Sequence, residues 1–226
     1  MCPTEADRRD WQRLLAAERR LQGIVPEAVL VGGTAAALHA GHRISLDGDH
    51  VVSDLKERFE EVLNRLESTP GWKTERIQRP VLILGALDGC LTGLRQLRRV
   101  RPIETQVVEG LRVPTLPEMA RIKAWLFLTR DSTRDFLDIT VLLDQLGEAR
   151  LGETFAHFDE IYERGPRGGS PILELVDTLA AARPVDRGAL DLKTYKGIVP
   201  PWDDWRHIEA RARFWAARLA KLSMRR

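Results

Sequence analysis

The feature that most constrains this chain of 226 residues is a pair of glycines, Gly32 and Gly33, directly after the short apolar run Val29–Val31. Glycine has no Cβ, so a strand that ends in two of them lets backbone N–H groups approach a bound group closely. Residues 34–39 then favour a helix, with Thr34 as its candidate N-cap. Because a helix N-terminus carries partial positive charge, this run predicts a strand, a glycine turn and a helix arranged to hold a phosphate.

Two aspartates, Asp47 and Asp49, follow the glycines at the end of a second predicted strand that contains Ile44 and Leu46. Residues at positions i and i+2 of a strand project from the same face, so both carboxylates reach one point. Magnesium prefers oxygen ligands and keeps water and substrate oxygens in its coordination shell. Two such ions, about 3.5–4 Å apart, can activate an attacking hydroxyl and neutralise a leaving pyrophosphate. The alternative is a surface turn, because Asp-Gly is a common turn dipeptide.

Strand signals dominate the first half of the chain and helix signals the second. The first half contains a predicted helix over residues 1–22, an amphipathic helix capped by Ser53, and further strands and a hairpin at residues 73–77, 81–87 and 104–113. Residues 92–101 are predicted to be irregular. Helices capped by Thr115 and Ser132 follow, with a tail helix from Trp205. This order predicts an α+β (mixed α/β) fold: a small mixed sheet with flanking helices in a core of residues 1–114, and a helical region over residues 115–226 that closes the cleft.

The two motifs, in this order and spacing, resemble the signature of the nucleotidyltransferase superfamily. More narrowly, Leu30-Val31-Gly32-Gly33-Thr34-Ala35 and His42-Arg43-Ile44-Ser45-Leu46-Asp47-Gly48-Asp49 are similar to the AbiEii/MenT-type toxin nucleotidyltransferases. Those proteins also carry a later helical lysine and an Arg-Asp-x-x-Asp element, which Lys123 and Arg134-Asp135-Phe136-Leu137-Asp138 match. The resemblance covers residues 29–143. Gly48 and His50 depart from it, because apolar or aromatic residues are usual there, and a glycine is expected to alter the aim of Asp49.

The resemblance implies an enzyme that uses Mg²⁺ or Mn²⁺ and moves a nucleotide unit from an NTP to an acceptor, with release of pyrophosphate. Asp47 and Asp49 would be catalytic and hold the metal, and Asp88 is a candidate third metal ligand. The other catalytic residues would be Lys123, Asp135 and Asp138, with one of these two aspartates orienting the lysine. The nucleotide-binding residues would be Gly32, Gly33, Thr34, Arg43 and Lys123.

The acceptor that the resemblance implies is tRNA, another RNA or a protein. The resemblance also implies that the protein is the toxin of a toxin–antitoxin or phage-defence system, with a cognate antitoxin protein as its partner. Two basic segments favour RNA: residues 95–101 contain four arginines, and residues 206–226 contain seven Lys or Arg against one acid. The structural alternative, which the sequence favours, is that both segments are solvated helix faces. Two other hypotheses are a catalytically decayed protein of the same fold that binds nucleic acid or a partner, and a phosphotransferase that uses the same cleft.

Each candidate residue also has a structural interpretation. Lys123 lies on an apolar helix face and could be a surface lysine that extends its stem over that face. Arg134 and Asp138 are four residues apart and could form a surface pair, and Arg43 could simply be exposed. The histidines could form a zinc cluster of His39, His42 and His50. The glycine-rich segment 165–170 has no preceding strand and no following Lys-Ser/Thr, so it is predicted to be a plain loop.

The composition is that of a globular protein, with 43% apolar and 30% charged residues. The polar first ten residues lack the apolar segment of a secretion signal, and the weakly polar stretch 28–40 is too short to span a membrane. Two cysteines, Cys2 and Cys90, cannot form a disulfide scaffold. The sequence therefore predicts a cytoplasmic protein that does not insert into membranes.

Overall fold

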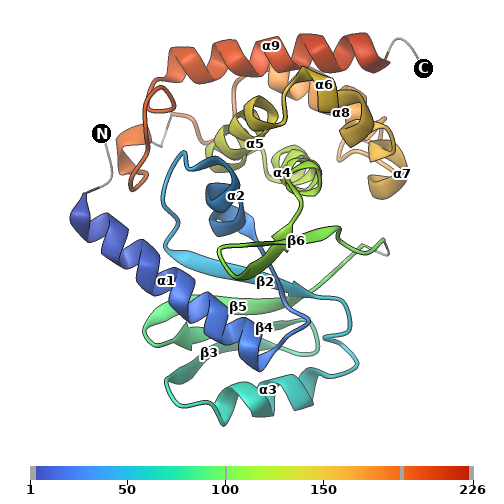
Figure 1. Cartoon of the computed structure of the whole chain (residues 1–226). Helices are drawn as coiled ribbons and strands as arrows, with labels where there is room; N and C mark the ends of the chain where they lie inside the picture. The colour runs from blue at the N-terminus through green and yellow to red at the C-terminus, as the bar shows by residue number, and fades with distance from the viewer. Residues whose placement is uncertain (1–3, 100, 189–190, 224–226) are drawn as a thin grey trace. The chain divides into compact units, whose positions relative to one another are not determined.

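The computed structural model describes residues 4–99, 101–188 and 191–223, and the chain divides into two compact units (Figure 1). Among the described residues, the sheet unit contains residues 4–38 together with Ile44–Thr115. The helical unit contains His39–Arg43 and the chain from Leu116 onward. The mixed α+β class and the small mixed sheet predicted from the sequence are confirmed. Among the described residues, no helix is both long enough and apolar enough to cross a membrane.

The sheet unit is built on five strands in the spatial order β1-β2-β5-β4-β3. The two central strands β2 and β5 run parallel, and every other neighbouring pair is antiparallel. In the parallel pair Asp47 lies opposite Leu91, and Asp49 lies opposite Gly93. The strands are β1 (Val29–Val31), β2 (Asp47–Val52), β3 (Trp72–Gln78), β4 (Leu82–Leu87) and β5 (Cys90–Gln96).

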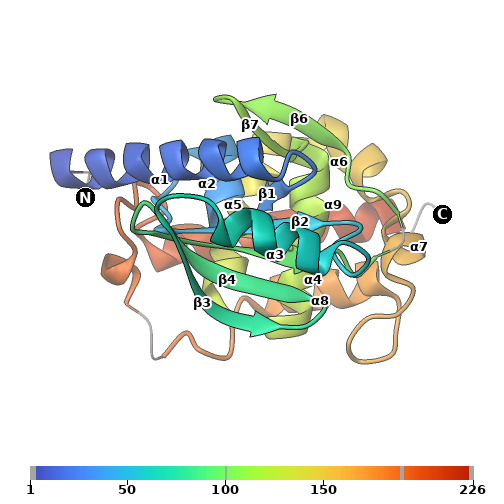
Figure 2. The same cartoon turned by 90° about the horizontal axis from the view of Figure 1, so that it is seen from below.

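Helices α1 (Glu5–Ile24) and α3 (Phe59–Glu67) supply the core that covers one face of this sheet. Figures 1 and 2 show α1 crossing the strands and α3 lying beside β3. The core side chains from the helices and strands are fully or almost fully buried, and they include Leu21, Val52, Val62, Leu66, Ile83 and Leu94. The hairpin of β6 (Thr105–Val108) and β7 (Leu111–Pro114) was predicted correctly, and β7 packs against β1.

The helical unit consists mainly of α-helices. The first two, α4 (Leu116–Arg130) and α5 (Thr133–Leu146), pack closely on each other. Ser132 caps α5 by accepting the Asp135 backbone N–H, and Gly147 ends the helix, both as predicted. Figure 1 shows α9 running along α5, α6 and α8. The remaining elements are α6 (Glu148–Phe155), α7 (Phe158–Tyr162), α8 (Pro171–Ala181), the short 3-10 helix η1 (Leu192–Thr194) and α9 (Trp205–Ser223).

Four local predictions were wrong. Helix α2 (Gly32–Ala40) begins at Gly32, so Thr34 lies within the helix and is not its N-cap. Strand β2 begins at Asp47, so the acids open the strand rather than end it. Helix α3 begins at Phe59 and not after Ser53. The segment expected to be irregular, residues 92–101, begins inside β5, because pairing with strands on both sides satisfies the backbone there.

Candidate functional site

Asp47 and Asp49 project from the same face of β2, as the sequence predicted. The alternating burial along the strand places Asp47 in solvent and Asp49 half in solvent, whereas Gly48 and His50 are buried on the opposite face. The hydroxyl of Ser45 donates a hydrogen bond to Asp47 Oδ1 at 3.1 Å and holds that carboxylate. The acids are therefore accessible and lie on a regular strand, so the surface-turn interpretation is wrong.

The backbone of Gly32 lies directly beside the second carboxylate. Val31 pairs with Asp49 across β1 and β2, and the next residue, Gly32, has a φ of +69° that favours glycine. A Cβ added at Gly32 would stand only 3.1 Å from Asp49 Oδ2. The first glycine of the motif thus lets the chain turn into α2 while passing close to an acid. The structure thus explains the glycine at position 32 by the neighbouring Asp49, and the approach of its N–H group to a bound phosphate stays a prediction.

Thr34 is placed differently from its predicted role in nucleotide binding. Its side chain is fully buried, and its hydroxyl donates to the backbone carbonyl of Asp47 at 2.5 Å. A hydroxyl used in this way holds the start of β2 next to α2. Gly33, by contrast, is half-buried at the start of α2, where backbone N–H groups have no partner within the helix.

Arg95, which the sequence placed only in a basic segment that favours RNA, lies beside the acid pair. It lies on β5, two residues after Gly93, which is the partner of Asp49, and therefore on the face that carries the acids. Its Nε is 3.3 Å from Asp49 Oδ1, and half of its side chain is exposed. The prediction that residues 92–101 were irregular concealed this, because only a strand brings position 95 back to the same face.

Asp88 does not join the acid pair. It occupies the turn between β4 and β5 with a φ of 52°, and its carboxylate is bound by Arg20 of α1 at 2.6–2.7 Å. Within the described part of the chain, no three His, Cys, Asp or Glu side chains form a group that could hold a metal ion. The alternative prediction of a zinc site formed by His39, His42 and His50 is therefore wrong. A three-carboxylate site that includes Asp88 is therefore not present in this structure.

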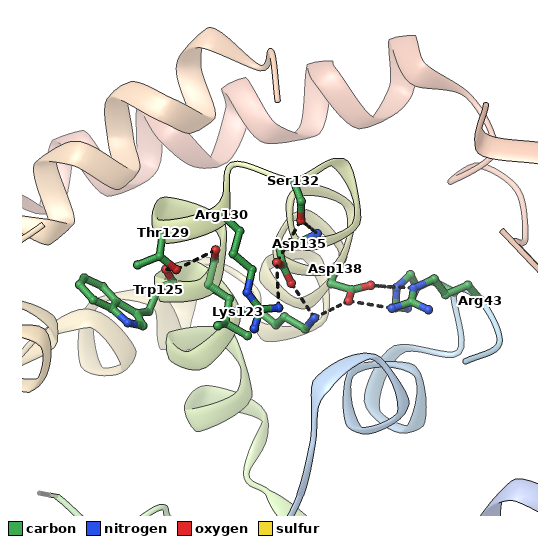
Figure 3. Close-up of polar contacts among 10 residues, drawn as sticks. Arg43, Lys123, Trp125, Thr129, Arg130, Ser132, Asp135 and Asp138 are labelled. Atoms are coloured by element: carbon green, nitrogen blue, oxygen red, sulfur yellow. Dashed lines mark hydrogen bonds and ion pairs between the residues drawn. The ribbon is translucent and has the colours of Figure 1, made fainter. Parts of the chain in front are cut away.

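Lys123 lies at the centre of a buried charge network in the helical unit (Figure 3). Its ammonium group is 2.8 Å from Asp135 Oδ1 and 2.7 Å from Asp138 Oδ2, and its side chain is only 2% exposed. Lys123 is therefore not a surface lysine. The sequence left open which aspartate orients it, and the structure shows that both do. Ser132 holds the second oxygen of Asp135 with a hydrogen bond of 3.0 Å.

Asp138 is bound on its other side by Arg43. Nε and one terminal nitrogen of the guanidinium donate to the two carboxylate oxygens, each at 2.9 Å, and Nε2 of His42 lies 2.7 Å from Oδ1. Burial alone would raise the pKa of Asp138, but the cations of Arg43 and Lys123 hold that pKa well below its usual value. Burial lowers the pKa of His42. Asp138 therefore does not form a surface pair with Arg134, and Arg43 is not a surface residue.

Ion pairs within the helical unit occupy several cations of the predicted basic tail. Arg211 binds Asp144, Arg213 lies 3.5 Å from Glu209, and Arg218 binds Glu148. Arg225 and Arg226, which belong to the same prediction, lie outside the described residues. The glycine-rich segment 165–170 is a loop, as predicted, and its Gly169 N–H donates to the buried carboxylate of Glu174.

Two solved structures from Helicobacter pylori resemble the whole chain. The structure of JHP933 aligns with 99% of this chain and 96% of its own, at a TM-score of 0.58 and 18% identity. The structure of a candidate nucleotidyltransferase aligns with 99% of this chain and 99% of its own, at a TM-score of 0.55 and 18% identity. The chain has a nucleotidyltransferase fold.

Comparison of the sequence alone finds less. No family model matches the chain. The heme uptake protein MmpL11 of Mycobacterium tuberculosis and the transport protein MmpL11 of Mycobacterium bovis are 31% identical to it over 97 residues. This segment is 40% of the chain and 10% of each relative, so the chain spans about a tenth of the length of the curated proteins it matches.

Proposed function

We propose that this protein is a magnesium-dependent nucleotidyltransferase that moves a nucleotide unit from an NTP to an acceptor. The observation that carries the proposal is the accessible pair Asp47 and Asp49 on one face of β2, with the Gly32 backbone beside Asp49. The nucleotidyltransferase fold supports it, because the motif residues lie on the strand and helix that the resemblance requires.

The residues present fit a magnesium ion. Magnesium is commonly bound by one or two protein carboxylates, with water and substrate phosphate oxygens as its other ligands. Asp47 and Asp49 offer two exposed or half-exposed carboxylates from one strand face, and Arg95 offsets one of their charges. Mn²⁺, which also takes oxygen ligands, would fit the same pair. When bound, the metal would supply positive charge next to the triphosphate.

The chain's own groups would bind and orient the nucleotide. The backbone N–H groups of Gly32 and Gly33 at the start of α2 suit the phosphates. Arg95 adds a cation at the edge of the acid pair. In the reaction, a hydroxyl oxygen of the acceptor bonds to the α-phosphorus, the bond to the bridging oxygen breaks, and pyrophosphate leaves while the hydroxyl proton passes to water. Catalysis then rests on positioning and electrostatics, with no covalent enzyme intermediate.

The network of Lys123, Asp135, Asp138 and Arg43 would act as a positioning framework. Lys123 is almost fully buried and already binds two carboxylates, so contact with a phosphate would require it to give up one of them. The fork between Arg43 and Asp138 fixes the segment that follows α2. We therefore assign these four residues to the stability of the helical unit, and we assign the contact with the nucleotide to the glycines and Arg95.

The experiment that tests the function is incubation of the protein with each of the four α-labelled NTPs, Mg²⁺ and total cellular RNA. The expected result is that one RNA species or the protein itself gains label from one NTP. The matched control is the double variant Asp47→Asn, Asp49→Asn, which keeps the shape of both side chains. Equal labelling by this variant would overturn the proposal.

The acceptor and the biological role belong to the same proposal. The narrower resemblance to AbiEii/MenT-type toxins supports RNA, above all tRNA, as the acceptor, and a cognate antitoxin protein as the partner. Growth arrest on expression, abolished by the double aspartate variant, is the expected result for a toxin. A protein of this fold that only binds nucleic acid is the second candidate, but the ion pairs of Arg211, Arg213 and Arg218 weaken the basic-tail observation that favoured it.

A further inference from the structure

A buried glutamate of α1 lies directly beneath the strand that carries the acid pair. Glu18 is fully buried, and the hydroxyl of Thr92 on β5 donates to its Oε2 at 2.8 Å. Gly48 is the partner of Thr92 in the parallel pair of strands, and a Cβ added at Gly48 would overlap the carboxyl group of Glu18. The glutamate therefore occupies the space that any other residue at position 48 would fill.

His50 completes this cluster. It follows Gly48 by two residues on the same buried face of β2, and its Nδ1 is 3.5 Å from Glu18 Oε2. Its imidazole is fully buried. Gly48 and His50 are the two positions at which the sequence departs from the pattern it resembles. In the structure the two departures are one arrangement, because both positions face the same carboxyl group.

A buried polar group without full hydrogen bonding costs stability, so an apolar core would be the cheaper solution here. An apolar residue at position 48 with no glutamate below it would give an ordinary strand. The chain instead places the carboxyl group of a glutamate from α1 under the residue that lies between Asp47 and Asp49. The carboxyl group of this side chain therefore packs directly against the backbone between the two acids.

We propose that Glu18 is a positioning residue for the acid pair: seated beneath Gly48 and held by Thr92, it fixes the backbone of β2 that presents Asp47 and Asp49. This proposal rests on the assignment of those acids as metal ligands. Residues that support metal ligands in this way alter metal affinity by about 10–100-fold when they are removed. Glu18 makes no contact with the nucleotide in this assignment, so it acts through the acids alone.

The test compares three variants. Glu18→Gln keeps the shape and an oxygen for Thr92, Glu18→Ala empties the space under Gly48, and Leu15→Ala removes another buried side chain of α1. Binding of Mn²⁺ alone is measured by electron paramagnetic resonance, alongside thermal unfolding. We expect Glu18→Ala to weaken Mn²⁺ binding by about tenfold or more, whereas Glu18→Gln and Leu15→Ala stay within about threefold of the wild type. Equal weakening in Glu18→Ala and Leu15→Ala would overturn the proposal.

A second measurement does not depend on metal binding. Amide hydrogen exchange of β2 is recorded for the metal-free wild type, for Gly48→Ala and for the double variant Glu18→Ala, Gly48→Ala. Gly48→Ala should speed exchange in β2, because the new Cβ displaces the glutamate, and the double variant should restore slower exchange. If exchange in β2 is the same in all three proteins, Glu18 does not position the strand. A wild type that binds no Mn²⁺ but shows this exchange pattern would overturn the proposed function and leave the coupling of residues 18 and 48 intact.

Discussion

The guanidinium of Arg43 binds the carboxylate of Asp138 through two parallel hydrogen bonds, although 95 residues separate them in the sequence. The pair is buried, and Lys123 binds Asp138 from another direction (Figure 3). Two cations share this carboxylate, and Asp135 supplies the second negative charge. The network is therefore balanced in charge, and the removal of any one member leaves a buried charge without its partner.

Asp138→Asn should accordingly destabilise the protein strongly. The variant keeps the shape of the side chain but leaves Arg43 and Lys123 with one carboxylate fewer, and loss of one member of a buried pair costs about 3–5 kcal/mol. Urea unfolding followed by circular dichroism measures this cost. Glu60→Gln is the matched control, because its pair with Arg79 is exposed and its urea midpoint should stay close to that of the wild type. Similar midpoints for both variants would contradict the buried network.

Lys123→Met separates the two roles considered for this lysine. Methionine keeps the apolar stem and removes the ammonium group, so a framework role predicts a loss of stability of about 3–5 kcal/mol. The affinity of the folded variant for NTP, measured by calorimetry at low temperature, should stay within about threefold of the wild type, since the ammonium group binds carboxylates rather than phosphate. Normal stability combined with weak NTP binding would show instead that Lys123 contacts the nucleotide.

Asp49→Asn should have the opposite profile. Asp49 is half exposed and its carboxylate pairs with the exposed Arg95, so its replacement should change the thermal midpoint little. Transfer of labelled nucleotide should fall by about a hundredfold or more, because a lost metal ligand removes charge stabilisation from the transition state. Arg95→Gln should show a smaller loss, expressed mainly in KM for the NTP. Full activity of Asp49→Asn would remove this acid from the site.

The sequence was sufficient for the parts of the site that are local. The glycines and the two aspartates are close in the chain, and strand periodicity alone places both acids on one face. Lys123 and the Asp135–Asp138 spacing were found by resemblance. The pairing of Asp138 with Arg43 was not found, because no local sequence pattern links Arg43 to a helix residue 95 positions away. Glu18 was also missed, since a glutamate in a charged amphipathic helix normally faces water, and only the absence of a Cβ at Gly48 allows it to be buried.

RNA binding, if RNA is the acceptor, should depend on exposed arginines rather than on paired ones. The affinity for tRNA should then fall with rising salt by a log–log slope of about −0.7 for each phosphate contact. Arg98 lies at an exposed position after β5. The variant Arg98→Gln should therefore lose one phosphate contact and make the slope shallower by about 0.7. Arg211→Gln should leave the slope unchanged and lower stability, because Arg211 binds Asp144. No tRNA binding at any salt concentration would point to a protein or small-molecule acceptor.

The pH dependence of stability offers a test of the buried state of Glu18. Burial raises the pKa of Glu18 to about 8, and the charges of Asp49 and Asp47 act in the same direction against the hydrogen bond from Thr92. Between its ordinary pKa and this value the folded protein keeps a proton that the unfolded chain has lost, so stability falls as pH rises from about 5 to 8. Burial lowers the pKa of His50 to about 3, and this shift makes stability fall as pH drops below about 6.5. This second effect does not depend on Glu18.

Glu18→Gln removes the first titration and retains the second. The free energy of unfolding of this variant, relative to the wild type, should therefore increase with pH from 5 to 8, by at most about 1.4 kcal/mol per pH unit, and level off above that range. Urea unfolding at a series of pH values measures the difference. Glu75→Gln, at an exposed position of β3, should run parallel to the wild type throughout. Parallel profiles for Glu18→Gln and the wild type would mean that folding does not raise the pKa of Glu18, which would contradict its burial as a neutral carboxyl group.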